Sequence, residues 1–299
     1  MADKYNIIDK PNERSSHKEV TIRGGGIIIW LAALFYFILN FNSSFYFFIG
    51  ITLVSCISFY DDIKSLPGSF RALTQFIAVI LIFYGLDIFS LFPWWIITLS
   101  IVISIGIINA YNFMDGINGI TGLYSIVVFS SLLYANNYIN SFINNDFFIF
   151  PIIACIIFLF FNFRKRAKCF AGDIGSVSIA FWIIYSLAKL IIETNSIIWI
   201  LFLAVYGVDS ICTIIHRLYL RQNIFEPHRM HFYQILSNEY KIDHRLVSIG
   251  YAILQIFISA IVLATYDKNF KYFIFVGIIF SLVLVYSSKF ILLKKWNHT

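Results

Sequence analysis

Residues 94–119 read WWIITLSIVISIGIINAYNFMDGING, an apolar run that ends in amides, one carboxylate and two glycines. The apolar part is long enough to cross a bilayer as a helix. The polar part then lies at a membrane surface, where amides and carboxylates without partners are costly. Polar clusters in such places are functional candidates by default. This stretch therefore predicts a membrane helix that ends in a candidate site.

The composition places the whole chain in a membrane. Of its 299 residues, 60% are hydrophobic and 13% are charged, and the mean hydropathy is +0.81. Soluble globular domains have about 45–50% apolar and about 25% charged residues, so that class is excluded. The four cysteines are scattered singly and indicate neither a zinc site nor a disulfide framework. The first 23 residues are polar and do not resemble a cleavable signal peptide.

Ten apolar runs are long enough to form membrane helices. The sequence thus predicts an all-α, polytopic integral membrane protein with about ten transmembrane helices and cytoplasmic active-site loops, as one domain over residues 1–299. The expected helix centres are Leu34, Val54, Val79, Ser100, Val127, Ile156, Trp182, Leu203, Leu254 and Ile279.

The basic residues predict the orientation, because cytoplasmic loops are enriched in Lys and Arg. Of the 22 such residues, only Lys189, Lys268 and Lys271 fall on the side opposite the N-terminus. An even number of helices puts both termini on the basic side. We therefore expect both termini in the cytoplasm, with residues 1–23 as a cytoplasmic segment. The net charge of +6 is explained by this bias, so no nucleic-acid partner is expected.

Two acidic clusters lie at the cytoplasmic helix ends. Asp61 and Asp62 end the second helix, followed by Lys64. Adjacent carboxylates repel unless a cation is near, so such pairs often serve metals or proton transfer, although a solvated helix end is the alternative. Asp173 begins the seventh helix. It is either the N-cap of that helix or an oxygen ligand for Mg²⁺, and the two roles are compatible.

Asn109, Asn112 and Asp115 recur at three-residue steps and are expected to share one face of a helix end. Gly119 and its neighbour Asn118 follow, and the glycine lets backbone approach a ligand closely. A helix cap would explain one of these residues but not all of them.

A fourth cluster lies in the basic loop 217–245. Arg229 is flanked by His228 and His231, a combination suited to phosphate because guanidinium offers paired donors and imidazole adds another. A basic loop with incidental histidines is the alternative. Asp209, in the preceding helix, is expected to be a structural partner for groups of this loop.

Together with residues 9–26, these segments resemble the polyprenyl-phosphate N-acetylhexosamine-1-phosphate transferases, of the glycosyltransferase 4 type, over nearly the whole chain. The Pro-Asn-x-Arg-Ser-Ser-His element at residues 11–17 and the Arg-Gly-Gly-Gly element at residues 23–26 are similar to the bacterial branch that starts O-antigen, enterobacterial common antigen or teichoic acid assembly. The branch that makes the first peptidoglycan lipid usually has three consecutive histidines where this chain reads His228-Arg229-Met230-His231.

The resemblance implies that a UDP-activated amino sugar gives its sugar 1-phosphate to undecaprenyl phosphate at the bacterial inner membrane, releasing UMP. It implies Mg²⁺, with Mn²⁺ as the alternative ion, held by Asn112 and Asp173. It implies catalytic roles for Asp61, Asp62 and Asp173, and substrate-binding roles for Lys64, Asn109, Asp115, Asn118, Gly119, His228, Arg229 and His231.

One departure and several alternatives stay open. Members of this branch commonly have a membrane helix before the Pro-Asn-x-Arg element, and this sequence starts ten residues before Pro11. The sequence does not decide which sugar is used or whether the protein forms a homodimer. A multispanning transporter is the main rival, for which Lys189, Glu193 and Asp209 leave room. A CDP-alcohol phosphotransferase would need a run of spaced aspartates on two helices after an Asp-Gly start, and no such run follows Asp115-Gly116.

Overall fold

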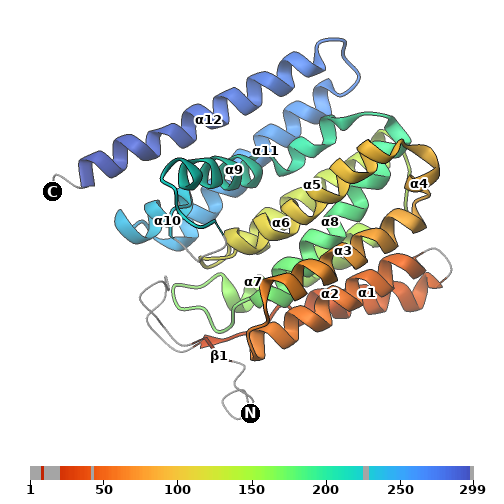
Figure 1. The fold of residues 1–299 in the computed structure, drawn as a ribbon, viewed down its shortest axis with the longest axis horizontal. Coiled ribbons are helices and arrows are strands. Elements are labelled where there is room, and N and C mark those ends of the chain that lie inside the picture. Colours follow the sequence, from red (N-terminus) through yellow and green to blue (C-terminus); the bar gives the residue numbers. More distant parts are fainter. Residues whose placement is uncertain (1–7, 10–20, 42–43, 225–228, 297–299) are drawn as a thin grey trace.

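The computed structural model describes residues 8–9, 21–41, 44–224 and 229–296. In this part of the chain, most residues lie in helices that run along one bundle (Figure 1). The strands described there are β1 (Ile8–Asp9) and β2 (Thr21–Ile22), which form a two-residue antiparallel pair. The protein is therefore an all-α polytopic membrane protein, as its composition predicts.

The long helices follow the apolar runs, and every expected centre lies in one of them or, for Leu203, in the 3-10 helix that leads into α9. They are α1 (Ile27–Leu39), α2 (Phe45–Ile63), α3 (Gly68–Gly85), α5 (Trp94–Met114), α6 (Ile120–Tyr138), α7 (Asp146–Asn162), α8 (Gly172–Thr194), α9 (Ala204–Tyr219), α11 (His244–Thr265) and α12 (Lys271–Trp296). Shorter pieces are α4 (Ile88–Leu91), the 3-10 helix η3 (Ile197–Leu203), α10 (Phe232–Gln234) and a π-helical turn η4 (Ile235–Glu239).

Seven of the described helices are long and apolar enough to cross a membrane, with η3 and α9 counted as one. Helix α1 has 13 residues and α7 has 17, whereas a straight span takes about 20. Helix α6 has 19 residues, but several of them are polar, including Ser125, Ser131 and Asn136. Ten helices are thus confirmed, whereas ten membrane crossings stay a prediction.

Helix α8 is the centre of the bundle. It contacts α1, α2, α5, α6 and η3, and 83% of its most apolar stretch is buried, against 17% for α5. A helix that is apolar all round is buried all round. Buried serines and alanines along α8 let neighbouring helices approach closely. The first turn of α8 is therefore held firmly at one end of the bundle.

The start of α1, which follows three successive glycines at residues 24–26, packs directly on the start of α8. A Cβ atom on Gly26 would overlap Gly175 of α8. The backbone N–H groups of Gly25 and Gly26 donate to the carbonyls of Phe170 and Ala171, at 2.9 and 3.0 Å. This contact fixes the chain just before α8.

The segments that carry the predicted site residues gather at one end of the bundle. Figure 1 shows β1, the connection between α7 and α8, and α10 at this end, on the left. Helices α5 and α12 have many exposed apolar side chains along the bundle, and only 17% and 22% of their most apolar stretches are buried. Extended exposed apolar surface of this kind fits contact with lipid. The cytoplasmic orientation of the site end stays a prediction.

Candidate active site

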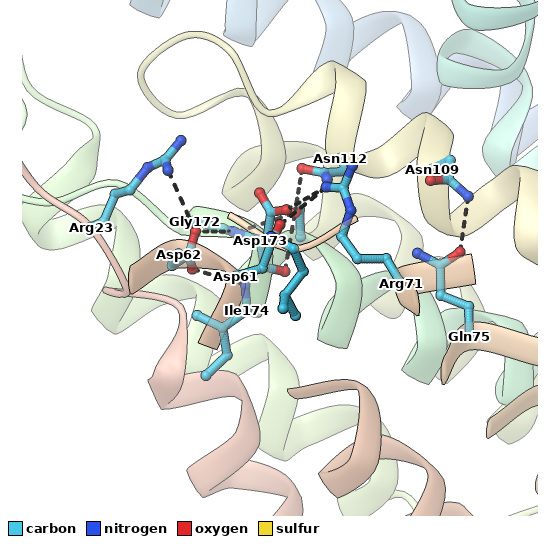
Figure 2. Close-up of polar contacts among 12 residues, drawn as sticks. Arg23, Asp61, Asp62, Arg71, Gln75, Asn109, Asn112, Gly172, Asp173 and Ile174 are labelled. Carbon is cyan, nitrogen blue, oxygen red and sulfur yellow. Dashed lines mark hydrogen bonds and ion pairs between the residues drawn. The ribbon is translucent and has the colours of Figure 1, made fainter. Parts of the chain in front are cut away.

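The carboxylate of Asp62, in the last turn of α2, caps the N-terminus of α8. Its Oδ1 accepts the backbone N–H of Asp173 at 3.0 Å, and its Oδ2 accepts that of Ile174 at 3.2 Å (Figure 2). The Asp62 side chain is fully buried, and Nη1 of Arg23 lies 3.9 Å from it. A carboxylate at this place satisfies unpaired N–H groups and interacts favourably with the helix dipole. Asp62 thus fixes where α8 begins.

The alternative in which Asp173 caps α8 is wrong. The N-cap position belongs to Ala171, and Asp173 lies in the first turn without a capping bond from its side chain. Gly172 adopts a left-handed conformation, with φ of 71°, and a Cβ atom there would overlap the Asp62 carboxylate. Because Asp62 supplies the cap from another helix, the Asp173 carboxylate is left to face the neighbouring cavity.

Arg71, in the first turn of α3, connects the acidic residues of two helices. Its Nη1 lies 3.1 Å from Oδ2 of Asp61 and 3.3 Å from Oδ2 of Asp173, as Figure 2 shows. The other Asp61 oxygen accepts the N–H of Leu66 at 2.5 Å, which closes the turn between α2 and α3. In the sequence, Arg71 is only one of the basic residues on the predicted cytoplasmic side. The Pro67-Gly68 turn was the available signal, because it brings the start of α3 back to the end of α2.

Asn112 and Asp173 line the same small cavity between α2, α3, α5 and α8. Its lining residues are Val54, Ile57, Ser58, Arg71, Thr74, Gln75, Asn112, Asp173 and Val177. The hydroxyl of Ser176 donates to Oδ1 of Asn112 at 3.3 Å. The structure therefore brings together the two residues that the resemblance names as metal ligands, although they are 61 positions apart in the chain.

The oxygen donors of this cavity fit Mg²⁺. That ion typically takes one or two carboxylates, substrate phosphate oxygens and waters, and the cavity offers the Asp173 carboxylate and the Asn112 amide oxygen. Within the described ranges, no group of three or more His, Cys, Asp or Glu side chains is arranged to hold a metal. A metal here would rely on these two protein ligands together with substrate, and the metal itself stays a prediction.

The other predicted site residues at and after the end of α5 bind neighbouring segments. Asn109 donates from Nδ2 to Oε1 of Gln75 at 3.0 Å and so ties α5 to α3. Asn118 donates from Nδ2 to the carbonyl of Arg164 at 2.8 Å, and the N–H of Gly119 donates to Oδ1 of Asn162 at 2.6 Å. The bonds of Asn118 and Gly119 hold the α5–α6 connection against Asn162, the last residue of α7, and Arg164, which follows shortly after it. The exposed Lys64 directly follows α2.

Asp115 follows the last residue of α5, and burial, with a smaller contribution from the charge of Asp62, raises its pKa from 3.8 to about 6. The folded protein then binds this proton more tightly than the unfolded chain does. The contribution to stability is full below about pH 4 and is lost as pH rises through about 6. We expect the melting temperature of the wild type, relative to Asp115→Asn, to fall between pH 4 and pH 7. Thermal unfolding in detergent measures this, with the exposed Asp267→Asn as control. A pH-independent difference would contradict it.

A second polar group forms around Asp209, which is buried. Its Oδ1 lies 3.1 Å from Nδ1 of His231 and accepts the N–H of Phe232 at 3.0 Å, while its Oδ2 accepts the hydroxyl of Tyr251 at 2.6 Å. The expectation that Asp209 is a structural partner for the loop is confirmed. Arg229, two residues before His231, is half-buried. His228 lies outside the residues that the structure describes.

This second group reaches the end of α5, where Asn112 lies. The Tyr233 hydroxyl donates to the carbonyl of Phe113 at 2.9 Å, and the rings of Phe113 and His231 are 6.3 Å apart between centroids. The loop of His231 and the cavity of Asp173 are therefore neighbours across the end of one helix.

Comparison with known proteins agrees with this arrangement. The model of glycosyl transferase family 4 matches residues 44–195, from the residue before α2 to the residue after α8. A probable undecaprenyl-phosphate N-acetylglucosaminyl 1-phosphate transferase of Bacillus subtilis is 28% identical, covering 95% of this chain and 85% of the relative. Undecaprenyl-phosphate alpha-N-acetylglucosaminyl 1-phosphate transferases of Yersinia pestis and Escherichia coli K12 are each 28% identical, over 79% of this chain and 71% and 70% of theirs.

The matched half of the chain contains the Asp61-Asp62 pair, Asn112 and Asp173, which are the residues that build the cavity or support it. The motifs, the helical fold and the match to the family model lead to the same result. The chain belongs to glycosyl transferase family 4, the family of polyprenyl-phosphate N-acetylhexosamine-1-phosphate transferases.

Proposed function

We propose that this protein transfers a sugar 1-phosphate, with N-acetylhexosamine 1-phosphate as the expected group, from a UDP-sugar to undecaprenyl phosphate. The observation that carries the proposal is the cavity in which Asp173 and Asn112 lie beside Arg71, at one end of a bundle of apolar helices. The names of the relatives supply the acceptor lipid and the transferred group. We place the reaction at the cytoplasmic face of the bacterial inner membrane, as a first membrane step of envelope glycan synthesis.

In this reaction an oxygen of the lipid phosphate attacks the β-phosphorus of the UDP-sugar. The bond between that phosphorus and the oxygen bridging to the uridine 5′-phosphate breaks, so UMP leaves and a diphosphate links sugar to lipid. Phosphoryl transfer of this kind depends chiefly on positioning and on charge neutralisation. When bound, Mg²⁺ neutralises charge on the diphosphate, and Mn²⁺ is the alternative ion.

The residues of the site have separate tasks. Asp173 and Asn112 hold the metal, and Asp62 keeps Asp173 in place through the first turn of α8. Asp61 orients Arg71, whose half-exposed guanidinium can receive the lipid phosphate as a planar pair of donors. For Asp62 we propose a positioning role in place of the catalytic role that the resemblance implies, because both its oxygens accept backbone N–H groups.

The loop around His231 and the α5–α6 connection are assigned to the donor. Arg229 and His231 bind the diphosphate, while Asp115, Asn118 and Gly119 shape the nucleotide pocket. The loop lies against the end of α5, next to Asn112, which supports this assignment.

The transporter alternative is not favoured. Lys189 and the exposed Glu193 lie in the last two turns of α8, at the end remote from Asp173. The oxygens of Asp209 accept hydrogen bonds from protein groups. Among the described residues, the three ionisable groups that left room for a transporter therefore do not gather around a shared path in the middle of the bundle.

An apolar cavity farther along the bundle supports a polyprenyl acceptor. It has a volume of about 340 Å³ and is lined mainly by α5, α8 and η3, including Ile103, Ser104, Leu187 and Ala188, and by Phe83 of α3. Helices α3, α5 and α8 also line the cavity of Asp173. A lipid whose phosphate lies at Arg71 can thus place its tail along the same three helices.

Filling this cavity tests the placement of the tail. We expect Ala188→Phe to lower kcat/KM for undecaprenyl phosphate about tenfold, because each displaced prenyl CH₂ loses roughly 0.8 kcal/mol of burial. Activity with a short-chain prenyl phosphate should change much less. UMP release with the two acceptors measures the difference, and Ala264→Phe on the exposed side of α11 is the matched control. Equal losses with both acceptors would place the tail elsewhere.

The function itself is tested with the purified full chain in detergent or nanodiscs. Undecaprenyl phosphate, Mg²⁺ and a panel of UDP-amino sugars are supplied, and UMP release is measured. We expect UMP with at least one sugar, loss of UMP release on addition of EDTA, and recovery on addition of excess Mg²⁺. Absence of UMP with every sugar, from protein that is monodisperse and unfolds cooperatively, would overturn the proposal.

A further inference from the structure

Lys289 is a buried cation in α12, outside the stretch that matches the family model. Its side chain has 0% exposure. The ammonium group donates to the hydroxyl of Tyr286 at 2.6 Å and to the backbone carbonyl of Met230, and it lies 4.7 Å from the centroid of the Tyr286 ring. An ionisable group in a membrane helix is costly and calls for an explanation by function. Here the cation contacts the residue immediately before His231.

A chain of hydrogen bonds leads from Lys289 to the Asp209 group. The hydroxyls of Tyr286 and Thr213 are 2.9 Å apart, and the Thr213 hydroxyl lies 3.3 Å from Oδ1 of Asp209. Lysine only donates and a carboxylate only accepts. The bonds therefore run in one direction, from Lys289 through Tyr286 and Thr213 to Asp209.

The two ends of this series of hydrogen bonds, Lys289 and Asp209, contact the same loop. Asp209 binds the ring of His231 and the N–H of Phe232, while Lys289 binds the carbonyl of Met230. Three successive loop residues are thus held between α9 and α12, which contact each other along the bundle. Satisfied polar networks of this kind rigidify their surroundings because the low dielectric strengthens each bond.

We propose that Lys289 is a positioning residue, which clamps the loop of Arg229 and His231 at the end of α5 so that these side chains meet the donor diphosphate. The proposal rests on the function proposed above, in which this loop binds the UDP-sugar. Lys289 does not touch the reacting atoms. It acts on the loop directly through the carbonyl of Met230. It also acts through Tyr286 and Thr213 on Asp209, which is hydrogen-bonded to the His231 ring.

The test compares Lys289→Met, which removes the ammonium group, with Lys294→Met, which removes an exposed cation from the same helix. We expect Lys289→Met to raise KM for the UDP-sugar about tenfold, the loss typical of one hydrogen bond to a charged group, with a smaller change in kcat. Lys289→Arg should recover part of the affinity. Tyr286→Phe keeps the ring and the bond to Met230, so it should shift KM in the same direction but less.

Hydrogen–deuterium exchange provides a readout that does not need turnover. Exchange in residues 229–239 should rise in Lys289→Met and stay at the wild-type level in Lys294→Met. Unchanged exchange would overturn the proposal, as would a fall in kcat and in melting temperature with no change in donor KM, which is the pattern of a purely structural lysine. If Lys289→Met does not fold, Lys289→Arg and Tyr286→Phe decide. If the wild type releases no UMP, the proposed function fails. A rise in exchange in Lys289→Met would then still show that Lys289 holds the loop, without a link to donor binding.

Discussion

Asp173→Asn is expected to lower kcat by about 10²–10³-fold, the usual effect of losing one preorganised charge contact in a transition state. Asn keeps the size of the side chain but removes the charge that faces the cavity with Asn112 and Arg71. The start of α8 should stay intact, because its N-terminus is capped by Asp62 and not by Asp173. UMP release at saturating substrates and Mg²⁺ measures the effect.

The matched control is Glu193→Gln, which neutralises an exposed carboxylate at the far end of the same helix and should leave kcat unchanged. The melting temperature of Asp173→Asn should also stay near that of the wild type. Turnover within a few-fold of the wild type would show that Asp173 is not needed for the reaction, and would contradict its role as a metal ligand.

Gly172→Ala should cost both stability and activity. Gly172 has φ of 71°, a conformation in which an L-residue with a Cβ atom loses roughly 1–2 kcal/mol. The added Cβ would also push against the Asp62 carboxylate, which caps α8. Because Asp173 is the next residue, we expect it to be displaced, and a displacement of about 1 Å can cost about 10²-fold in rate. Thermal unfolding and UMP release measure the two effects.

Gly106→Ala is the control for this change. Gly106 lies inside α5, and a Cβ atom there would meet nothing within 4 Å. Alanine favours a helix over glycine by about 1 kcal/mol, so this variant should be as stable as the wild type or more so, with normal turnover. A Gly172→Ala protein that behaves in the same way would show that the Asp62 cap does not set the geometry of Asp173.

The sequence predicted the helices well because their signal is local. Each apolar run is read directly from hydropathy, and all ten expected centres lie in helices. The number of membrane crossings is harder to predict. Helices α1 and α7 are shorter than a straight span, and α6 contains polar residues. Hydropathy alone does not decide whether such helices cross, because a bundle can bury polar groups such as Asn136, which bonds the loop after α6.

The site was predicted in part. The resemblance named Asn112 and Asp173, and the structure places both on one cavity. The cap by Asp62 was missed because local spacing favours a cap from within the same helix, whereas the actual partner is 111 residues away. The link from Lys289 to the His231 loop was missed for the same reason, since 59 residues separate Lys289 from Met230.

The cap by Asp62 also has a consequence for biogenesis. The carboxylate is synthesised more than a hundred residues before the amides that it serves, so the nascent chain carries an acidic group whose partners do not yet exist. Contacts between such distant segments form late, since the intervening chain must first be ordered. The reactive end of the bundle therefore cannot be complete before the start of α8 is synthesised, and a ribosome-bound intermediate that stops before Gly172 has the Asp62 carboxylate without the helix that it caps.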